Sequence, residues 1–231
     1  MNSSVIRNKN SAEAGFTLVE IAIVLVIIGL LLGGILKGQE MITQAKIKNI
    51  VNDFNGITVA VTSYQDRYRA LPGDDLNASA RWTTQAPASG NGNGNIAGLY
   101  NALPGVSAPA TAAESNLFWQ HLRIAGFVAG ATTGPASGAQ PPNAAGGIIG
   151  VETGNPGTSG LGFSSLILCF SNLPEKIASA VDGQVDDGVP NTGQIRGQLG
   201  GSNPPTANNA SGAATAYVET GVNQYLLCKN Y

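Results

Sequence analysis

One carboxylate stands alone in an apolar segment near the start of the chain. Glu20 is the only charged residue among the 21 residues from position 16 to position 36. An ionised side chain is unfavourable in an apolar environment unless a cation pairs with it. We therefore expect Glu20 to meet a positively charged partner, rather than to act as an acid or a base in catalysis.

A second group of carboxylates lies in the C-terminal part of the chain. Asp182, Asp186 and Asp187 occur close together, with Gly183 and Gly188 among them. Hard oxygen ligands on such a flexible segment suit calcium. The spacing is not that of an EF-hand loop, and Asp-Gly pairs are also ordinary turn sequences. The sequence of this segment is consistent with a calcium site and also with a simple turn.

The sequence offers little else for catalysis. His121 is the only histidine, and no nucleophile elbow, phosphate-binding loop or zinc-binding pattern is present. We expect a protein that is not an enzyme and that requires no cofactor. The chain has 12 basic and 14 acidic residues, a net charge of −2. Because the basic residues form no local cluster, nucleic acid is not predicted as a partner.

The segment that carries Glu20 has the length of a membrane-spanning helix. A helix of 21 residues is about 31 Å long, enough to cross the bilayer core. No small-residue cleavage site follows it, and the chain from Lys37 onward continues as helix. Apolar residues then recur at alternating intervals of three and four, which predicts one face of an amphipathic helix. These residues are Ile47, Ile50, Phe54, Ile57, Val61, Tyr64 and Tyr68. The turn sequence Pro72-Gly73 predicts the helix end near residue 70.

The remaining residues, 71–231, are long enough to form one core. Their composition is rich in glycine, alanine and asparagine, and three stretches are typical of long loops. These stretches are residues 85–95, 129–146 and 200–215.

Few regular elements are expected between these loops. The pattern predicts a helix over residues 115–126 and a buried strand over 164–170. A second helix should follow, with Asn172 as its cap and Pro174 in its first turn. Two further strands are expected over residues 194–199 and 224–228. The predicted fold class is α+β, with a long N-terminal helix packed on a small antiparallel sheet.

The N-terminal pattern resembles a known family. The residues Gly15-Phe16-Thr17-Leu18-Val19-Glu20, followed by about twenty apolar residues, resemble the prepilin leader and transmembrane segment of type IV pilins and type II secretion pseudopilins. A simple membrane anchor is the alternative, but it would explain the apolar run without explaining Glu20. The resemblance implies a leader at residues 1–15, a transmembrane half-helix at 16–36, an amphipathic half-helix at 37–70 and a pilin-like head at 71–231.

The resemblance also implies how the N-terminus is processed. Prepilin peptidase would cut between Gly15 and Phe16 and would methylate the new amine of Phe16. Glu20 would then pair with the N-terminal ammonium of a neighbouring subunit.

The implied location is the bacterial inner membrane, crossed once, with the head in the periplasm. The implied partners are other pilin or pseudopilin subunits, prepilin peptidase, the inner-membrane assembly platform and membrane lipid. The product would be an extracellular type IV pilus or a periplasmic pseudopilus. Three roles remain open: a minor pilus subunit, a pseudopilin that drives protein export, and a tip-located module for adhesion or DNA uptake.

With the head outside the cytoplasm, its two cysteines are expected to form a disulfide. Cys169 and Cys228 both fall in strand-like segments. Closing a loop of about 60 residues would stabilise the fold by about 4 kcal/mol in the chain-entropy model. Two free thiols are the alternative. The resemblance also bears on Asp182, Asp186 and Asp187, since some pseudopilin heads hold calcium in C-terminal loops.

Overall fold

The computed structural model describes residues 16–104, 113–154, 160–200 and 217–231. The chain divides into two compact units, one ending at Thr43 and the other beginning at Gln44. The first unit contains the apolar part of helix α1, and the second contains the rest of that helix and the head. The predicted α+β class is confirmed, because a long N-terminal helix and a four-stranded antiparallel sheet are both present.

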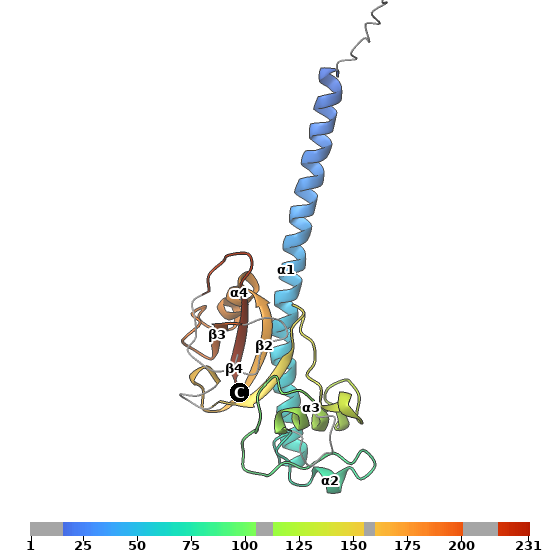
Figure 1. Ribbon diagram of the computed structural model, residues 1–231, viewed down its shortest axis with the longest axis vertical. Coiled ribbons are helices and arrows are strands. Elements are labelled where there is room, and N and C mark those ends of the chain that lie inside the picture. The colour runs from blue at the N-terminus through green and yellow to red at the C-terminus, as the bar shows by residue number, and fades with distance from the viewer. Residues whose placement is uncertain (1–15, 105–112, 155–159, 201–216) are drawn as a thin grey trace, which may run out of the picture. The chain divides into compact units, whose positions relative to one another are not determined.

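Helix α1 (Leu18–Tyr68) is the longest element. In the second unit, six of the seven residues of the predicted apolar stripe form the buried face of this helix, and Ala60 adds to it; Tyr68 is only partly buried against the same core. The ring of Phe54 lies 4.1 Å from the ring of Phe170 on the sheet, measured between centroids. Figure 1 shows the strands of the head beside this half of α1. The three-four periodicity therefore predicted correctly which face of the helix packs on the head.

The sheet has the strand order β1-β2-β4-β3, with every neighbouring pair antiparallel. Its strands are β1 (Ile149–Thr153), β2 (Leu166–Pro174), β3 (Ile195–Leu199) and β4 (Gln224–Asn230). The expected strands correspond to β2, β3 and β4.

Strand β1 was missed by the sequence analysis. It is short and contains Gly150, which weakens a strand pattern. The structure shows why a glycine stands there: a Cβ at Gly150 would lie 2.0 Å from the carbonyl oxygen of Tyr100. The segment around Tyr100 crosses closely over this strand, and no local pattern reveals that contact.

Both faces of the sheet are covered. Leu168 and Phe170 of β2 belong to the core shared with α1, whereas Ile167 and Cys169 point into a second cluster on the opposite face. Residues of the second cluster are Tyr100, Leu161, Phe163, Ile167, Cys169, Leu226 and Cys228. Burial on both sides explains the continuous apolar runs in β2 and β4, because neither strand has a solvent-facing side.

The described part of the head contains the helices α2 (Ala78–Arg81), α3 (Glu114–Ile124) and α4 (Glu175–Val185), with 3-10 turns at η2 (Pro135–Gly138) and η3 (Gly160–Gly162). The expected helix over residues 115–126 is α3. The expected second helix is α4, but the prediction that Asn172 caps it is wrong.

Asn172 lies inside β2, with a φ of 61° at an irregularity between Phe170 and Leu173. Strand pairing continues through Leu173, opposite Tyr225, as far as Pro174. The helix therefore cannot begin before residue 175, and Pro174 occupies the N-cap position.

The turn after α1 is fixed by a buried carboxylate. Asp75 accepts hydrogen bonds from the Tyr64 hydroxyl at 2.7 Å and from the Asn77 N–H at 2.9 Å. It also forms an ion pair with Arg81. Burial alone would raise the pKa of the Asp75 carboxyl, but the hydrogen bonds from Arg81 and Tyr64 outweigh it and lower that pKa. The Tyr64 contact ties the last turns of α1 to the following loop, and the contacts with Asn77 and Arg81 hold that loop together, as expected for a helix stop.

Candidate functional site

The N-terminus of α1 is closed by three reciprocal hydrogen bonds between Thr17 and Glu20. The Thr17 N–H and hydroxyl both donate to Oε2 of Glu20, each at 2.9 Å, and the Glu20 N–H donates to the Thr17 hydroxyl oxygen at 3.3 Å. Since α1 begins at Leu18, Thr17 is the N-cap and Glu20 is the third helical residue. This arrangement is a capping box, which satisfies backbone donors that a helix end leaves unpaired.

The capping role of Thr17 was missed by the sequence analysis. The signal was nevertheless present, because a threonine followed three residues later by glutamate, before an apolar run, is the capping-box pattern. Phe16 precedes the cap, and its side chain is exposed. Gly15 and the rest of the expected leader lie outside the described residues.

The helix that follows this cap exposes its apolar side chains. From Phe16 to Leu36, the large apolar residues have exposed fractions between 46% and 91% in the single chain. Among the described residues, α1 is the one helix long and apolar enough to cross a membrane, by length and composition. A continuous apolar surface of this kind marks a membrane-contacting or protein-contacting segment.

The two cysteines lie directly opposite each other in the sheet. Cys169 of β2 pairs in register with Cys228 of β4, and their sulfur atoms form a disulfide with a Cα–Cα distance of 4.0 Å. Both residues are fully buried in the cluster behind the sheet. The bond is the pairing expected from the sequence, and it fastens the C-terminal strand to the middle of the head.

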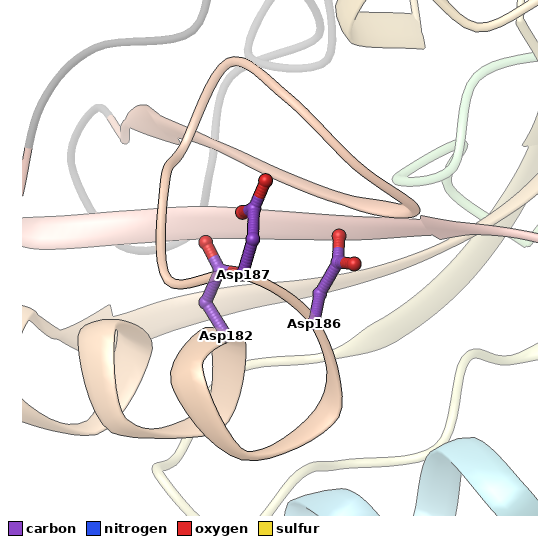
Figure 2. Close-up of side chains that lie close together, drawn as sticks. All are labelled: Asp182, Asp186 and Asp187. Carbon is purple, nitrogen blue, oxygen red and sulfur yellow. The ribbon is translucent and has the colours of Figure 1, made fainter.

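The acidic cluster is assembled at the C-terminal end of α4. Asp182 lies in the last turns of the helix, Asp186 is its C-cap, and Asp187 follows. One carboxylate oxygen from each lies within 4.8 Å of those of the other two. Figure 2 shows the three side chains projecting from the helix end toward the loop that follows.

The three carboxylates differ in their surroundings. Asp182 is fully buried; its Oδ2 accepts a hydrogen bond of 2.6 Å from the Tyr217 hydroxyl, whereas its Oδ1 has no hydrogen-bond partner among the described residues. Burial raises the pKa of Asp182; hydrogen bonds from the Tyr217 hydroxyl and the Gly188 N–H oppose this rise, the charges of Asp187 and Asp186 add to it, and the net shift is upward. Asp187 is exposed, and hydrogen bonds from Thr192 and the backbone lower its pKa.

This donor set fits calcium in its chemistry. Calcium takes hard oxygen ligands at about 2.3–2.6 Å, so two oxygens that bind one ion lie at most about 5 Å apart. The three carboxylates meet that limit, and the Oδ1 atom of buried Asp182 lacks a donor. One oxygen of these carboxylates already accepts a hydrogen bond within the loop, because Oδ2 of Asp186 accepts the Ile195 N–H at 2.8 Å.

His121 is placed as a structural residue. It is fully buried on α3; its Nδ1 accepts the Gly73 N–H at 3.0 Å, and its Nε2 lies 2.9 Å from the carbonyl oxygen of Ala88. The neutral ring with its proton on Nε2 satisfies both contacts, and neither nitrogen is available to a substrate.

The comparisons with known proteins bear on the N-terminal segment. Residues 10–36 match the family model described as the prokaryotic N-terminal methylation motif. This is the prepilin motif of type IV pilins and pseudopilins, so the resemblance noted in the sequence is confirmed and the chain carries an N-terminus of the kind that prepilin peptidase processes. Together with the apolar helix, the motif fits a membrane-anchored protein. A search of curated proteins found no match.

The buried environment of His121 predicts a pH dependence of stability. Burial lowers the pKa of His121; the hydrogen bond to the Ala88 carbonyl and the nearby Asp75 raise it, Arg81 lowers it, and the net shift is downward. The unfolded chain therefore binds the proton first, so the free energy of unfolding should decrease as the pH falls below about 6.5, by up to about 1.4 kcal/mol per pH unit.

The matched variant is His121→Gln, whose amide can accept from Gly73 and donate to Ala88 without titrating. Urea unfolding of the wild type and the variant at pH 7 and pH 5 measures the difference. The wild type should lose more stability than the variant between these values. Equal losses would show that His121 does not titrate in this range.

Proposed function

We propose that this protein is a structural subunit of a type IV pilus or a type II secretion pseudopilus. Prepilin peptidase would cut between Gly15 and Phe16 and methylate Phe16, and residues 16–36 would hold the subunit in the inner membrane until assembly. The observation that carries the proposal is Glu20, a carboxylate fixed at the start of an exposed apolar helix within the matched methylation motif.

The contacts of Glu20 suit a pairing role. Both hydrogen bonds from Thr17 go to one oxygen, Oε2, and neither ion pair among the described residues includes Glu20. The capping box thus holds the carboxylate in place and leaves Oε1 for a cation from another molecule. Cleavage before Phe16 would leave an ammonium at the N-terminus of every subunit, about one helical turn before Glu20. A charge in an apolar bundle becomes tolerable when such a partner reaches it.

The helix surface also suits close packing between subunits. Gly29 and Gly33 lie four residues apart, as do Gly34 and Gly38, and a Cβ at any of them would meet nothing within 4 Å in the single chain. Small residues at this spacing allow helices to approach closely in a membrane. The head of 161 residues carries long loops, and such bulk favours a minor subunit over the repeated subunit of a tight filament.

The central prediction separates the charge of Glu20 from its capping role. Glutamine at the third helical position can still accept from the N-cap backbone, so Glu20→Gln should leave α1 and leader cleavage intact but lose the charge pair. We expect normal processing and at least about tenfold less variant in sheared filaments, since an unpaired buried ammonium costs more than about 1.4 kcal/mol.

Glu40→Gln, farther along α1, is the matched control and should assemble as the wild type does. Mass spectrometry of the mature N-terminus reports cleavage, and immunoblots of sheared filaments report assembly. Wild-type incorporation of Glu20→Gln would eliminate the charge-pairing mechanism. Gly15→Ala should instead remain uncut, and normal cleavage of that variant would contradict the assigned site.

We also propose that Asp182, Asp186 and Asp187 bind calcium. Support comes from the convergence of their oxygens and from the unsatisfied Oδ1 of buried Asp182. The same loop holds the edge of the sheet, since Asp186 accepts from Ile195 at the start of β3. An ion at this position would offset the mutual repulsion of three carboxylates and would strengthen the attachment of the loop to the sheet.

Calcium should therefore raise the melting temperature of the full-length protein in detergent relative to EDTA. A ligand at one hundred times its dissociation constant stabilises a fold by about 2.7 kcal/mol. Asp187→Asn should reduce the effect, because it removes a ligand charge at an exposed position. Asp66→Asn removes an exposed carboxylate outside the cluster and should leave the calcium effect unchanged. The same melting temperature in calcium and in EDTA would show that the acidic segment is only a turn.

A further inference from the structure

A loop of the head contains two consecutive Asn-Gly pairs, which we define as the Asn-Gly loop, residues 91–95. Its sequence is Asn91-Gly92-Asn93-Gly94-Asn95. Asn-Gly is the sequence most prone to deamidation, because glycine offers little steric hindrance to its own backbone nitrogen. That nitrogen attacks the side-chain carbonyl carbon of the preceding asparagine.

The fold requires these residue types. Gly92 and Gly94 have φ values of 72° and 83°, in the left-handed region that glycine adopts without strain. A Cβ at Gly92 would also lie 2.5 Å from a methyl carbon of Leu76. The Asn91 side chain accepts the Asn93 N–H at 3.0 Å, and the Asn93 side chain accepts the Asn95 N–H at 2.8 Å. The turns that shape the loop thus depend on the two pairs that are chemically labile.

Asp74 lies beneath this loop and binds its backbone. Asp74 is buried, with 5% of the residue exposed. Oδ1 accepts the Gly92 N–H at 2.5 Å and the Asn93 N–H at 3.2 Å, and Oδ2 accepts the Gly94 N–H at 2.7 Å. The two glycine nitrogens held by Asp74 are the two atoms that deamidation would use as nucleophiles.

We propose that Asp74 protects Asn91 and Asn93 from deamidation by holding the nitrogens of Gly92 and Gly94. The amide nitrogen attacks only after it has lost its proton. A carboxylate at hydrogen-bond distance opposes that loss, because the developing negative charge would lie beside an existing one. The hydrogen bond also keeps each nitrogen directed at Asp74, away from the asparagine side chain.

The suppressed reaction uses water alone as co-reactant. The glycine nitrogen gives its proton to solvent and bonds to the asparagine Cγ. The bond from Cγ to the side-chain nitrogen then breaks, and that nitrogen takes a proton from solvent and leaves as ammonia. Water opens the resulting succinimide to aspartate or isoaspartate, so each event replaces a neutral amide by a carboxylic acid.

The chain contains its own reference site. Asn55-Gly56 lies within α1 and is remote in sequence from Asp74. The Gly56 nitrogen lies inside a helical segment, where the backbone geometry also disfavours succinimide formation. Deamidation at Asn55 therefore reports unfolding of the head, and a change confined to Asn91 and Asn93 reports the Asn-Gly loop.

The test is site-resolved peptide mapping of the full-length protein in detergent during incubation at mildly alkaline pH. In Asp74→Asn, deamidation at Asn91 and Asn93 should accelerate about tenfold, the effect of losing one charge-assisted hydrogen bond from the attacking group. Asn55 should be unchanged. Asp66→Asn removes an exposed carboxylate at the end of α1 and should leave all three rates as in the wild type.

Unchanged rates in Asp74→Asn would overturn the proposal, and slower rates would show that the carboxylate acts as a base. A second comparison needs no variant and covers the case in which Asp74→Asn fails to fold. In the wild type, the rates at Asn91 and Asn93 should be at least about tenfold lower in the native protein than in urea. Equal native and unfolded rates would contradict protection.

Discussion

A carboxylate in an apolar helix must be satisfied, and this constraint governs the N-terminal unit. Glu20 is partly satisfied by its own chain, because the backbone and hydroxyl of Thr17 donate to one of its oxygens. The capping box fixes the position of the charge without neutralising it. Neutralising the Glu20 charge needs a cation. Under the proposed function, cleavage at the methylation motif would create that cation, the N-terminal ammonium of a neighbouring subunit. Assembly under the proposed function therefore depends on Glu20, whereas the apolar residues around it provide the anchor.

The head follows a related rule. Charged residues are sparse in this chain, yet several acids are buried and accept backbone N–H groups from loops. Asp74 holds the Asn-Gly loop, Glu114 accepts from Asn91 and Ala97, and Glu152 accepts from Tyr100. Each contact satisfies backbone donors that a glycine-rich loop cannot pair within itself. Together with the disulfide, these carboxylates hold loops that contain little apolar side-chain area.

The sequence predicted the elements whose pattern is local. The spacing of apolar residues identified the buried face of α1, and the apolar runs identified β2 and β4. Strand β1 was not predicted, because the glycine at position 150 is required by a close contact with Tyr100, which lies far away in the sequence. The misplaced cap at Asn172 has a similar cause, since pairing with β4 extends β2 beyond its apolar run. Thr17 was visible as a capping residue, whereas the role of Asp74 depends on a loop that lies far along the chain.

The most direct test of the central claim is a cryo-EM structure of filaments that contain this subunit. The Glu20 carboxylate should lie within about 4 Å of the N-terminal nitrogen of a neighbouring subunit, while its Oε2 remains bonded to Thr17. A filament in which Glu20 has no contact beyond its own Thr17, with every neighbouring amine out of reach, would contradict the account.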